Sequence, residues 1–188
     1  MATNPVRSGR VPLGLALVLL LAVLPTGASA STVEHGGAGG GAHLLHQLAK
    51  VRRATVQSRW TGTPTDAGYA LMPPLDGCIQ NPGVGAMGYH YFNQELMDDL
   101  SEDPLRPEAL VYAPGRHGKL RLAAVEYIVP GDAWHAAGNT EPPEVLGRPM
   151  HILNPALGWY ILHAWVWKYN PDGIFEDWNP RVVCPPAP

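Results

Sequence analysis

The 188-residue sequence lacks the motifs that mark several common classes of enzyme. It contains no G-x-S-x-G motif, which holds the nucleophilic serine of α/β-hydrolases at a sharp turn. It also has no phosphate-binding loop, because the glycine run in residues 36–42 lacks the Lys and Ser/Thr that such a loop uses. These absences count against a serine hydrolase and against a P-loop nucleotide-binding protein.

Positive charge and long apolar runs are also scarce. The chain has 13 Lys and Arg against 16 Asp and Glu, for a formal net charge of −3, so no basic face for nucleic acid or anionic lipid is expected. The longest apolar run, residues 11–24, falls short of the ~20 residues that a membrane-spanning helix needs. From the charge we expect no nucleic-acid partner, and from the short apolar run no membrane-spanning helix.

Residues 1–30 have the pattern of a secretory signal peptide. Arg7 and Arg10 precede the apolar run, and Ala28 to Ala30 have the small-x-small form of a cleavage site. An uncleaved membrane anchor is the alternative, and the short apolar run counts against it. Cleavage would remove two cations and no acid, which leaves a formal charge of −5 on a chain that begins near Ser31. The prediction is a secreted, extracellular protein with no stable membrane anchor after cleavage.

Cysteine is nearly absent, with Cys78 and Cys184 the only two. In an exported protein, two cysteines allow a single internal pairing. A bridge between them would close a loop of about 107 residues, which contributes on the order of 4–5 kcal/mol in the chain-entropy account. Two free thiols, or two metal ligands, are the alternatives. We predict a disulfide that ties the C-terminal tail to the start of the folded core.

Glycine and proline, in contrast, are abundant, at 21 and 20 residues. So many breakers favour short strands joined by turns over long helices. Residues 31–42 hold five glycines and are expected to form a flexible lead-in. Apolar residues at three- and four-residue spacing then predict a helix from His43 to Arg59. The length of residues 43–188 suits a single secreted domain with its own core.

Four segments have the composition of β-strands, rich in β-branched and aromatic residues. They are residues 87–92, 109–113, 119–129 and 159–168, and a loop of five residues joins the second and third as a hairpin. The predicted fold class is α+β: an N-terminal helix packed on a small antiparallel β-sheet or partial barrel, with one disulfide.

Three of these strands each carry one polar side chain among large apolar neighbours: His90, Glu126 and His163. Burying an isolated polar group is costly, and carboxylates are almost never fully buried without a partner. Strand alternation separates Glu126 from the two cations of its strand. It predicts an inward face made of Leu120, Leu122, Ala124, Glu126 and Ile128. A β-bulge that turns Glu126 outward, or a Tyr or Arg partner, is the alternative.

Two imidazoles and one carboxylate are a common ligand set for zinc, iron or copper. We predict that His90, Glu126 and His163 face one interior and satisfy one another there, either directly, through water or through a divalent transition metal. Two functional classes follow. One is a ligand- or metal-binding or interaction module. The other is a metal-dependent enzyme, either a hydrolase or an oxygen-using enzyme, in which the metal activates water or substrate.

Aromatic residues suggest a second set of binding positions. Residues 130–157 form a long, breaker-rich excursion of a kind that often serves as a lid or binding loop, and it carries Trp134 and His135. With Trp165 from the strand at 159–168, these residues are candidates to contact a small molecule, a glycan or a protein. The alternative is that they pack over the sheet.

A series of short motifs runs through the chain in order. They include MGYHYFN (87–93), LRLAAVEYIV (120–129), LHAWVWKYNPDGIF (162–175) and WNPRVVC (178–184). The series resembles an uncharacterised family of secreted bacterial proteins, a domain of unknown function. The resemblance implies that the motifs belong to one domain and supports the disulfide. It implies no reaction.

Overall fold

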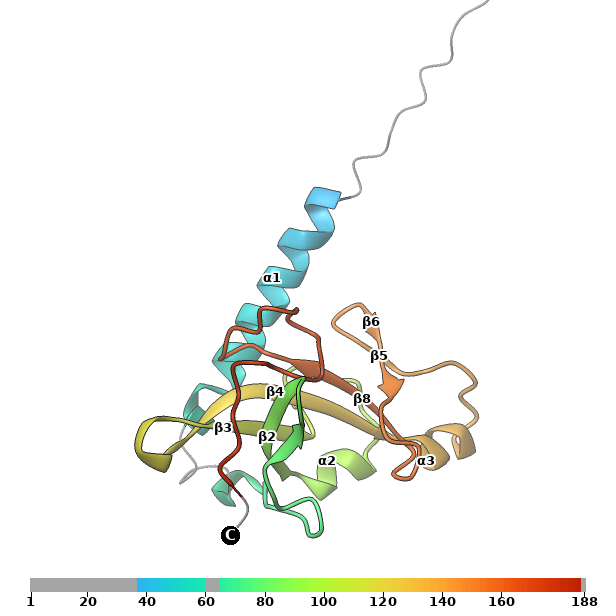
Figure 1. Cartoon of the computed structure of the whole chain (residues 1–188). Coiled ribbons are helices and arrows are strands. Elements are labelled where there is room, and N and C mark those ends of the chain that lie inside the picture. The colour runs from blue at the N-terminus through green and yellow to red at the C-terminus, as the bar shows by residue number, and fades with distance from the viewer. Residues whose placement is uncertain (1–36, 60–64, 187–188) are drawn as a thin grey trace, which may run out of the picture. The chain divides into compact units, whose positions relative to one another are not determined.

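The computed structural model describes residues 37–59 and 65–186, which lie in one compact unit, Gly36–Pro188. A long helix accompanies a curled antiparallel sheet that forms half of a barrel (Figure 1). The predicted α+β class is therefore confirmed. The predicted signal peptide and the first part of the predicted lead-in lie outside the described residues. Within the two described ranges, no helix combines the length and the hydropathy needed to span a bilayer.

The main sheet has six strands in the order β1-β2-β3-β4-β8-β7, and every neighbouring pair is antiparallel. All four strands predicted from the sequence are present and adjacent in this sheet. A separate two-stranded hairpin is made by β5 and β6. The strands are β1 (Ile79–Asn81), β2 (Gly85–Phe92), β3 (Ala109–Pro114), β4 (Leu120–Pro130), β5 (Glu144–Val145), β6 (Arg148–Pro149), β7 (His151–Ile152) and β8 (Trp159–Ala164).

The helix α1 (Gly37–Ala54) begins six residues before the predicted start at His43. Glycine weakens a helix interior by about 1 kcal/mol but does not forbid it. The C-terminal half of α1 is anchored, because Leu48 and Val51 are buried in a core shared with β4 and β8. The shorter helices are η1 (Val56–Arg59), η2 (Thr65–Ala67), α2 (Gln94–Asp98), η3 (Arg116–Gly118) and α3 (Gly131–Ala136).

A β-bulge in β4 alters the predicted faces of that strand. Val111 pairs with Ala124 and Tyr112 with Leu122, so Ala123 is an extra residue without a partner in β3. The bulge turns Leu122 and Leu120 toward the core that contains α1, so the prediction that these two leucines share the face of Glu126 is wrong. Beyond Arg121 both faces of β4 are buried down to Val129, because α1 covers one face and the C-terminal segment covers part of the other.

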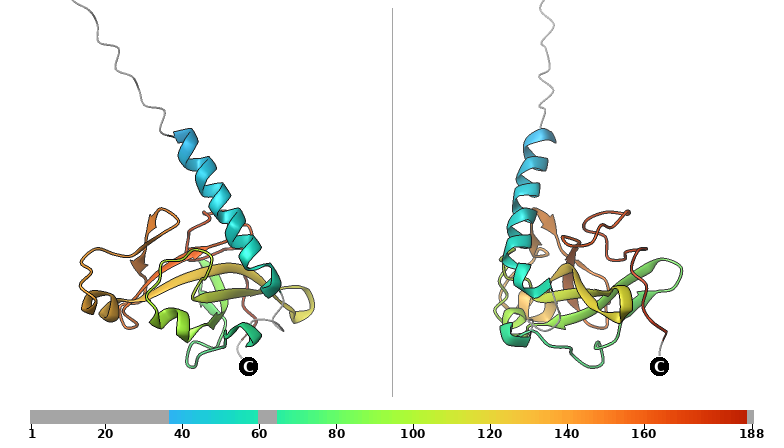
Figure 2. Two further views of the ribbon diagram at one scale, coloured as in Figure 1. Left: turned by 180° about the vertical axis from the view of Figure 1, so that it is seen from behind. Right: turned by 90° about the vertical axis from the view of Figure 1, so that its left-hand side faces the viewer.

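The chain leaves the sheet after Ala164, four residues before the predicted end of this strand. The amides of Trp167 and Lys168 donate to the carbonyl of Ala123, the bulged residue, instead of continuing the ladder. Trp167 still lies against α1 and the turn after it, because its ring packs under Arg52 and its Nε1 donates to Thr55 Oγ1. Residues 176–184 then run over the side of the sheet opposite α1, as the right-hand view of Figure 2 shows.

The C-terminal segment is attached at its far end in two ways. Asn179 exchanges two backbone hydrogen bonds with Ala86 of β2. Gly85 permits this approach, since a Cβ there would lie 2.7 Å from the Asn179 backbone. The predicted disulfide is present between Cys78 and Cys184, with their Cα atoms 5.7 Å apart. The segment that covers this face is therefore tethered both covalently and by pairing.

Candidate metal centre

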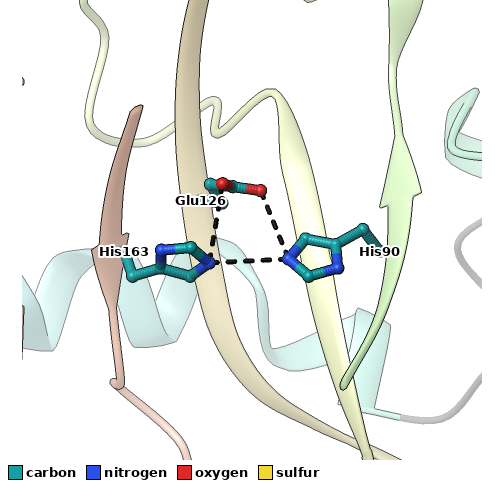
Figure 3. Close-up of side chains that lie close together, drawn as sticks. All are labelled: His90, Glu126 and His163. Carbon is teal, nitrogen blue, oxygen red and sulfur yellow. Dashed lines mark hydrogen bonds and ion pairs between the residues drawn. The ribbon is translucent and has the colours of Figure 1, made fainter. Parts of the chain in front are cut away.

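Three neighbouring parts of the sheet bring His90, Glu126 and His163 together. Glu126 of β4 and His163 of β8 are direct cross-strand partners. His90 lies on β2, which is separated from β4 only by β3. Their side chains point toward one another from the same face of the sheet (Figure 3). The three residues converge as predicted, because strand alternation places each of them on the same face of the sheet.

The potential ligand atoms of the three residues lie close together, and the two imidazoles approach different oxygens of the Glu126 carboxylate. His90 Nε2 lies 3.4 Å from Glu126 Oε2, and His163 Nε2 lies 3.5 Å from Glu126 Oε1. The two Nε2 atoms are 3.5 Å apart. Ordinary N–H···O hydrogen bonds span about 2.7–3.2 Å, so these contacts are long for direct bonds. Ligand bonds of about 2.0–2.1 Å in a tetrahedral zinc site place neighbouring ligand atoms about 3.3–3.4 Å apart.

All three side chains are removed from water. The exposed fractions of the residues are 0% for His163, 1% for His90 and 5% for Glu126. Burial raises the pKa of Glu126, although His163 acts in the opposite direction. Burial, together with repulsion from His163, lowers the pKa of His90 to about 3. His90 is therefore neutral at pH 7, as a metal ligand must be.

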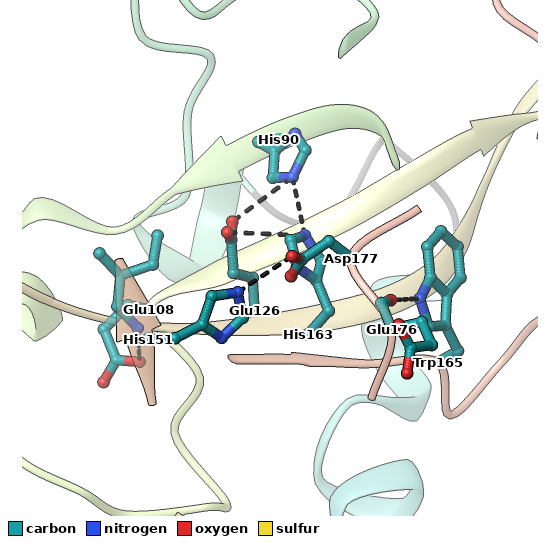
Figure 4. Close-up of polar contacts among 9 residues, drawn as sticks. His90, Glu108, Glu126, His151, His163, Trp165, Glu176 and Asp177 are labelled. Atoms are coloured by element: carbon teal, nitrogen blue, oxygen red, sulfur yellow. Dashed lines mark hydrogen bonds and ion pairs between the residues drawn. The ribbon is translucent and has the colours of Figure 1, made fainter. Parts of the chain in front are cut away.

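His163 has a different electrostatic environment. Burial alone would lower its pKa, but the nearby carboxylates of Glu126 and Asp177 outweigh burial and raise it. Asp177 Oδ1 lies 3.2 Å from His163 Nδ1, on the side of the ring away from Glu126 (Figure 4). When Nδ1 donates its hydrogen to Asp177, the lone pair of Nε2 faces His90 and Glu126. Such a carboxylate–histidine pair is the usual outer support of a metal-bound imidazole.

Asp177 is itself held by a second histidine. Its Oδ2 lies 3.0 Å from Nε2 of His151, which is largely exposed at the edge of the sheet on β7. Burial would raise the pKa of Asp177, but its bonds to His163 and His151 outweigh burial and lower it. The carboxylate is thus kept charged beside His163.

His90 has no comparable support. Its Nδ1 is buried and forms no hydrogen bond of normal geometry with any described residue, although the backbone of Gly88 opposes the fall of its pKa. The ring stacks on Phe92, with centroids 5.8 Å apart and planes 20° apart. Packing therefore fixes the direction of Nε2 in His90, whereas a hydrogen bond does so in His163.

Trp165, a predicted binding residue, packs against His163 and supports the segment that carries Asp177. It is buried and stacks on His163, with centroids 6.4 Å apart and planes 17° apart. Its Nε1 donates a hydrogen bond of 2.6 Å to the carbonyl of Glu176, the residue before Asp177. Trp165 therefore sets the position of the segment that carries Asp177.

An apolar pocket of about 350 Å³ opens beside the three candidate ligands. His90 and Glu126 form part of its wall, while His163 and Asp177 are not among its lining residues. Most of the remaining wall is apolar and comes from β2, β8 and the loop between β7 and β8. It includes Leu75, Phe92, Leu153, Leu157, Trp159 and Ile161. Two of the three candidate ligands are therefore reached from an apolar space.

The other two predicted binding residues lie elsewhere. Trp134 donates its Nε1 hydrogen to the carbonyl of Glu141, and His135 contacts the carbonyl of Asn139 and the hydroxyl of Tyr160. Neither Trp134 nor His135 lines the apolar pocket. Their contacts hold the excursion after β4, and a role of these two residues in binding stays a prediction.

Sequence reasoning missed Asp177 and His151. The turn at residues 170–173 indicated that the chain reverses after β8, but the segment that follows has no strand or helix period. Alternation rules cannot assign a direction to side chains in such a segment. The position of Asp177 beside Nδ1 of His163 is set by tertiary contacts alone.

Comparison with known proteins does not assign the chain to a family. No protein-family profile, no curated protein and no solved structure matches the chain. The resemblance of its motifs to an uncharacterised secreted family stays a prediction, and the function has to be argued from the site.

Proposed function

We propose that the protein binds a divalent transition metal ion, with zinc as the first candidate, through Nε2 of His90, Nε2 of His163 and the carboxylate of Glu126. The cluster of potential ligand atoms carries this proposal, because one atom from each residue lies within 4.8 Å of the others. The closest contacts, of 3.4, 3.5 and 3.5 Å, are long for direct hydrogen bonds and leave room for a metal among the three side chains.

The charge of the centre supports the same assignment. A carboxylate and two imidazoles buried together are costly unless each is satisfied, and three contacts near 3.5 Å satisfy them poorly. A divalent cation would replace those contacts with short ligand bonds and would displace the proton from His163. The Asp177 carboxylate would then orient the bound imidazole.

The setting is that of an extracellular module. The Cys78–Cys184 disulfide is consistent with an oxidising compartment, and secretion through residues 1–30 belongs to this proposal. Neither cysteine is available as a metal ligand while the bridge is intact. The expected donor set is therefore two nitrogens and one or two oxygens from the protein.

A metal-dependent enzyme is the second candidate, because three protein ligands leave a coordination position for water or substrate. The lining of the pocket places this function second. Among the described residues of the wall, Glu126 is the sole carboxylate. If it binds the metal, no other carboxylate is at hand to act as a general base. Binding therefore ranks above hydrolysis.

The test is metal uptake by tag-free protein that has been stripped with a chelator and dialysed. Elemental analysis after incubation with zinc should show one zinc per chain. Glu126→Gln and His163→Ala should each lower zinc affinity at least about 100-fold, because even the loss of a group that only supports a ligand lowers metal affinity 10–100-fold. His46→Ala is the matched control, because His46 is exposed on α1. Circular dichroism of each variant checks that it folds.

Two outcomes would contradict the proposal. One is a folded protein that takes up no zinc, copper, iron or manganese at stoichiometric level. The other is zinc uptake that survives both Glu126→Gln and His163→Ala but is lost in His46→Ala, which would place the ion at the exposed helix.

A further inference from the structure

The pocket beside the centre has no ligand assigned by the metal proposal. We infer that it takes a small amphiphile, an apolar chain or single ring with one anionic head group such as a carboxylate, and that the head group reaches the metal. This inference rests on the proposed function, because the metal is what would bind the head group.

The wall of the pocket selects the apolar part of the ligand. Phe92, Trp159 and Ile161 form an inner apolar surface on β2 and β8. Leu153 and Leu157, from the loop between β7 and β8, also line it and remain 37% and 39% exposed. Large aliphatic side chains left open to water at the edge of an apolar cavity gain from an apolar occupant.

The polar end of the pocket selects the head group. A divalent metal bound by one carboxylate and two neutral imidazoles leaves a net charge of +1 among the groups that contact it. Asp177 does not line the pocket and is paired with His151. No Lys or Arg lines the pocket among the described residues, so the metal is the single cation available there. An anionic oxygen would neutralise it in surroundings of low polarity.

The size and polarity of the pocket narrow the predicted partners. A volume of about 350 Å³ is at the lower end for small-molecule sites, which span about 300–1,000 Å³. A glycan would bring many hydroxyl groups to a wall with few polar groups, namely the side chains of His90, Glu126 and Asn154 and the indole N–H groups of Trp159 and Trp178. Unpaired hydroxyls would be costly to bury. Of the predicted small molecule, glycan or protein, the small molecule therefore fits this pocket.

Calorimetric titration with acetate, butyrate, hexanoate and octanoate tests the inference on zinc-loaded and zinc-free protein. Affinity for zinc-loaded protein should rise about fourfold per buried methylene until the pocket is filled. Octanoate should bind the zinc-free protein at least tenfold more weakly. Octanol, which has the same chain without the charge, should not show this dependence on zinc.

A variant of the pocket wall distinguishes binding of the apolar chain from binding of the metal. Leu153→Ser with Leu157→Ser should weaken octanoate about tenfold and leave acetate and zinc affinity unchanged, because neither leucine carries a metal ligand atom. Leu45→Ser, on an exposed position of α1, is the matched control. Equal affinity for acetate and octanoate, or equal octanoate affinity with and without zinc, would overturn the inference while the metal proposal stands. Failure to take up zinc at all would overturn both.

Discussion

Two buried glutamates, one on β4 and one just before β3, have very different surroundings. Glu126 lies on β4, and Glu108 immediately precedes Ala109, the residue of β3 that pairs with Glu126. Their exposed fractions are 5% and 2%. Glu126 faces two imidazoles, whereas the carboxylate of Glu108 accepts a 3.0 Å hydrogen bond from the amide of Ile128.

The difference shows that burial alone does not identify a site. Burial raises the pKa of Glu108 to about 8, which keeps it mostly protonated and uncharged at pH 7. Burial also raises the pKa of Glu126, but His163 opposes that effect. Glu108 is a neutral group that closes a backbone hydrogen bond. Glu126 has partners that can share a metal, and this distinction can be tested.

The largest expected difference is in zinc affinity. Glu126→Gln removes an anionic ligand, so zinc should bind at least about 100-fold more weakly. Glu108→Gln keeps an amide oxygen for Ile128 and should leave zinc affinity within about twofold. Competition with a chromophoric chelator measures both. Equal losses in the two variants would mean that general disturbance of the sheet, rather than ligand removal, controls zinc binding.

Asp177→Asn should have the next largest effect. The Asp177 carboxylate orients His163 and makes its ring a more basic ligand. An amide carries no charge and loses this effect, so zinc affinity should fall about 10–100-fold. The variant retains all three proposed ligands. The same chelator competition applies, with Asp172→Asn as control because Asp172 lies in the same segment. An unchanged zinc affinity in Asp177→Asn would remove Asp177 from the account.

A smaller effect on stability is expected from Glu108→Gln. The folded pKa of Glu108 is about 8 against a model value of 4.5, so the folded state keeps a proton that the unfolded state releases. Stability is then lost as the pH rises from about 4.5 to 8. Gln has no proton to lose. Chemical denaturation should show the variant about 1 kcal/mol more stable than wild type at pH 8, after the cost of burying its amide.

At pH 5 the stability difference between wild type and Glu108→Gln should be much smaller than at pH 8. There the wild-type carboxyl is protonated when folded and close to its ordinary pKa when unfolded, so the advantage of Gln should vanish or reverse. A constant difference between the two proteins from pH 5 to pH 8 would show that the carboxyl of Glu108 does not titrate as described.

Small losses of both zinc affinity and stability are expected from Trp165→Phe. Phenylalanine keeps an aromatic ring against His163 but loses the hydrogen bond to the carbonyl of Glu176. Asp177 should then be held less firmly, and zinc affinity should fall about threefold to tenfold, with about 1 kcal/mol lost from the free energy of unfolding. Zinc competition and chemical denaturation measure the two quantities. A large stability loss with unchanged zinc affinity would limit Trp165 to packing.

The strands and the convergence of the three polar residues could be predicted from the sequence because strand alternation is regular. Each of His90, Glu126 and His163 is the polar member of an apolar strand face. The same rule failed at Leu122, because the bulge at Ala123 inserts a residue that no periodic pattern reveals. The start of α1 was also misplaced, since glycine-rich sequence is read as flexible even where a packed helix extends into it.

Asp177 beside the centre and Glu108 outside it could not be predicted, for a common reason. Asp177 lies in an irregular segment, whose direction depends on the Asn179–Ala86 pairing and the disulfide. Glu108 stands just outside the predicted strand at 109–113, and strand alternation assigns a face only to residues within a strand. Its burial depends on the neighbouring strand, through the amide of Ile128. Both residues are defined by tertiary contacts.

The account depends most on a metal held by His90, Glu126 and His163. Anomalous diffraction at the zinc edge, from crystals of the stripped protein reloaded with one equivalent of zinc, tests it directly. The account predicts a single strong anomalous peak inside the sheet, about 2.0–2.2 Å from both Nε2 atoms and from a Glu126 oxygen. Fully loaded crystals with the peak at exposed histidines, and none between these three side chains, would contradict it.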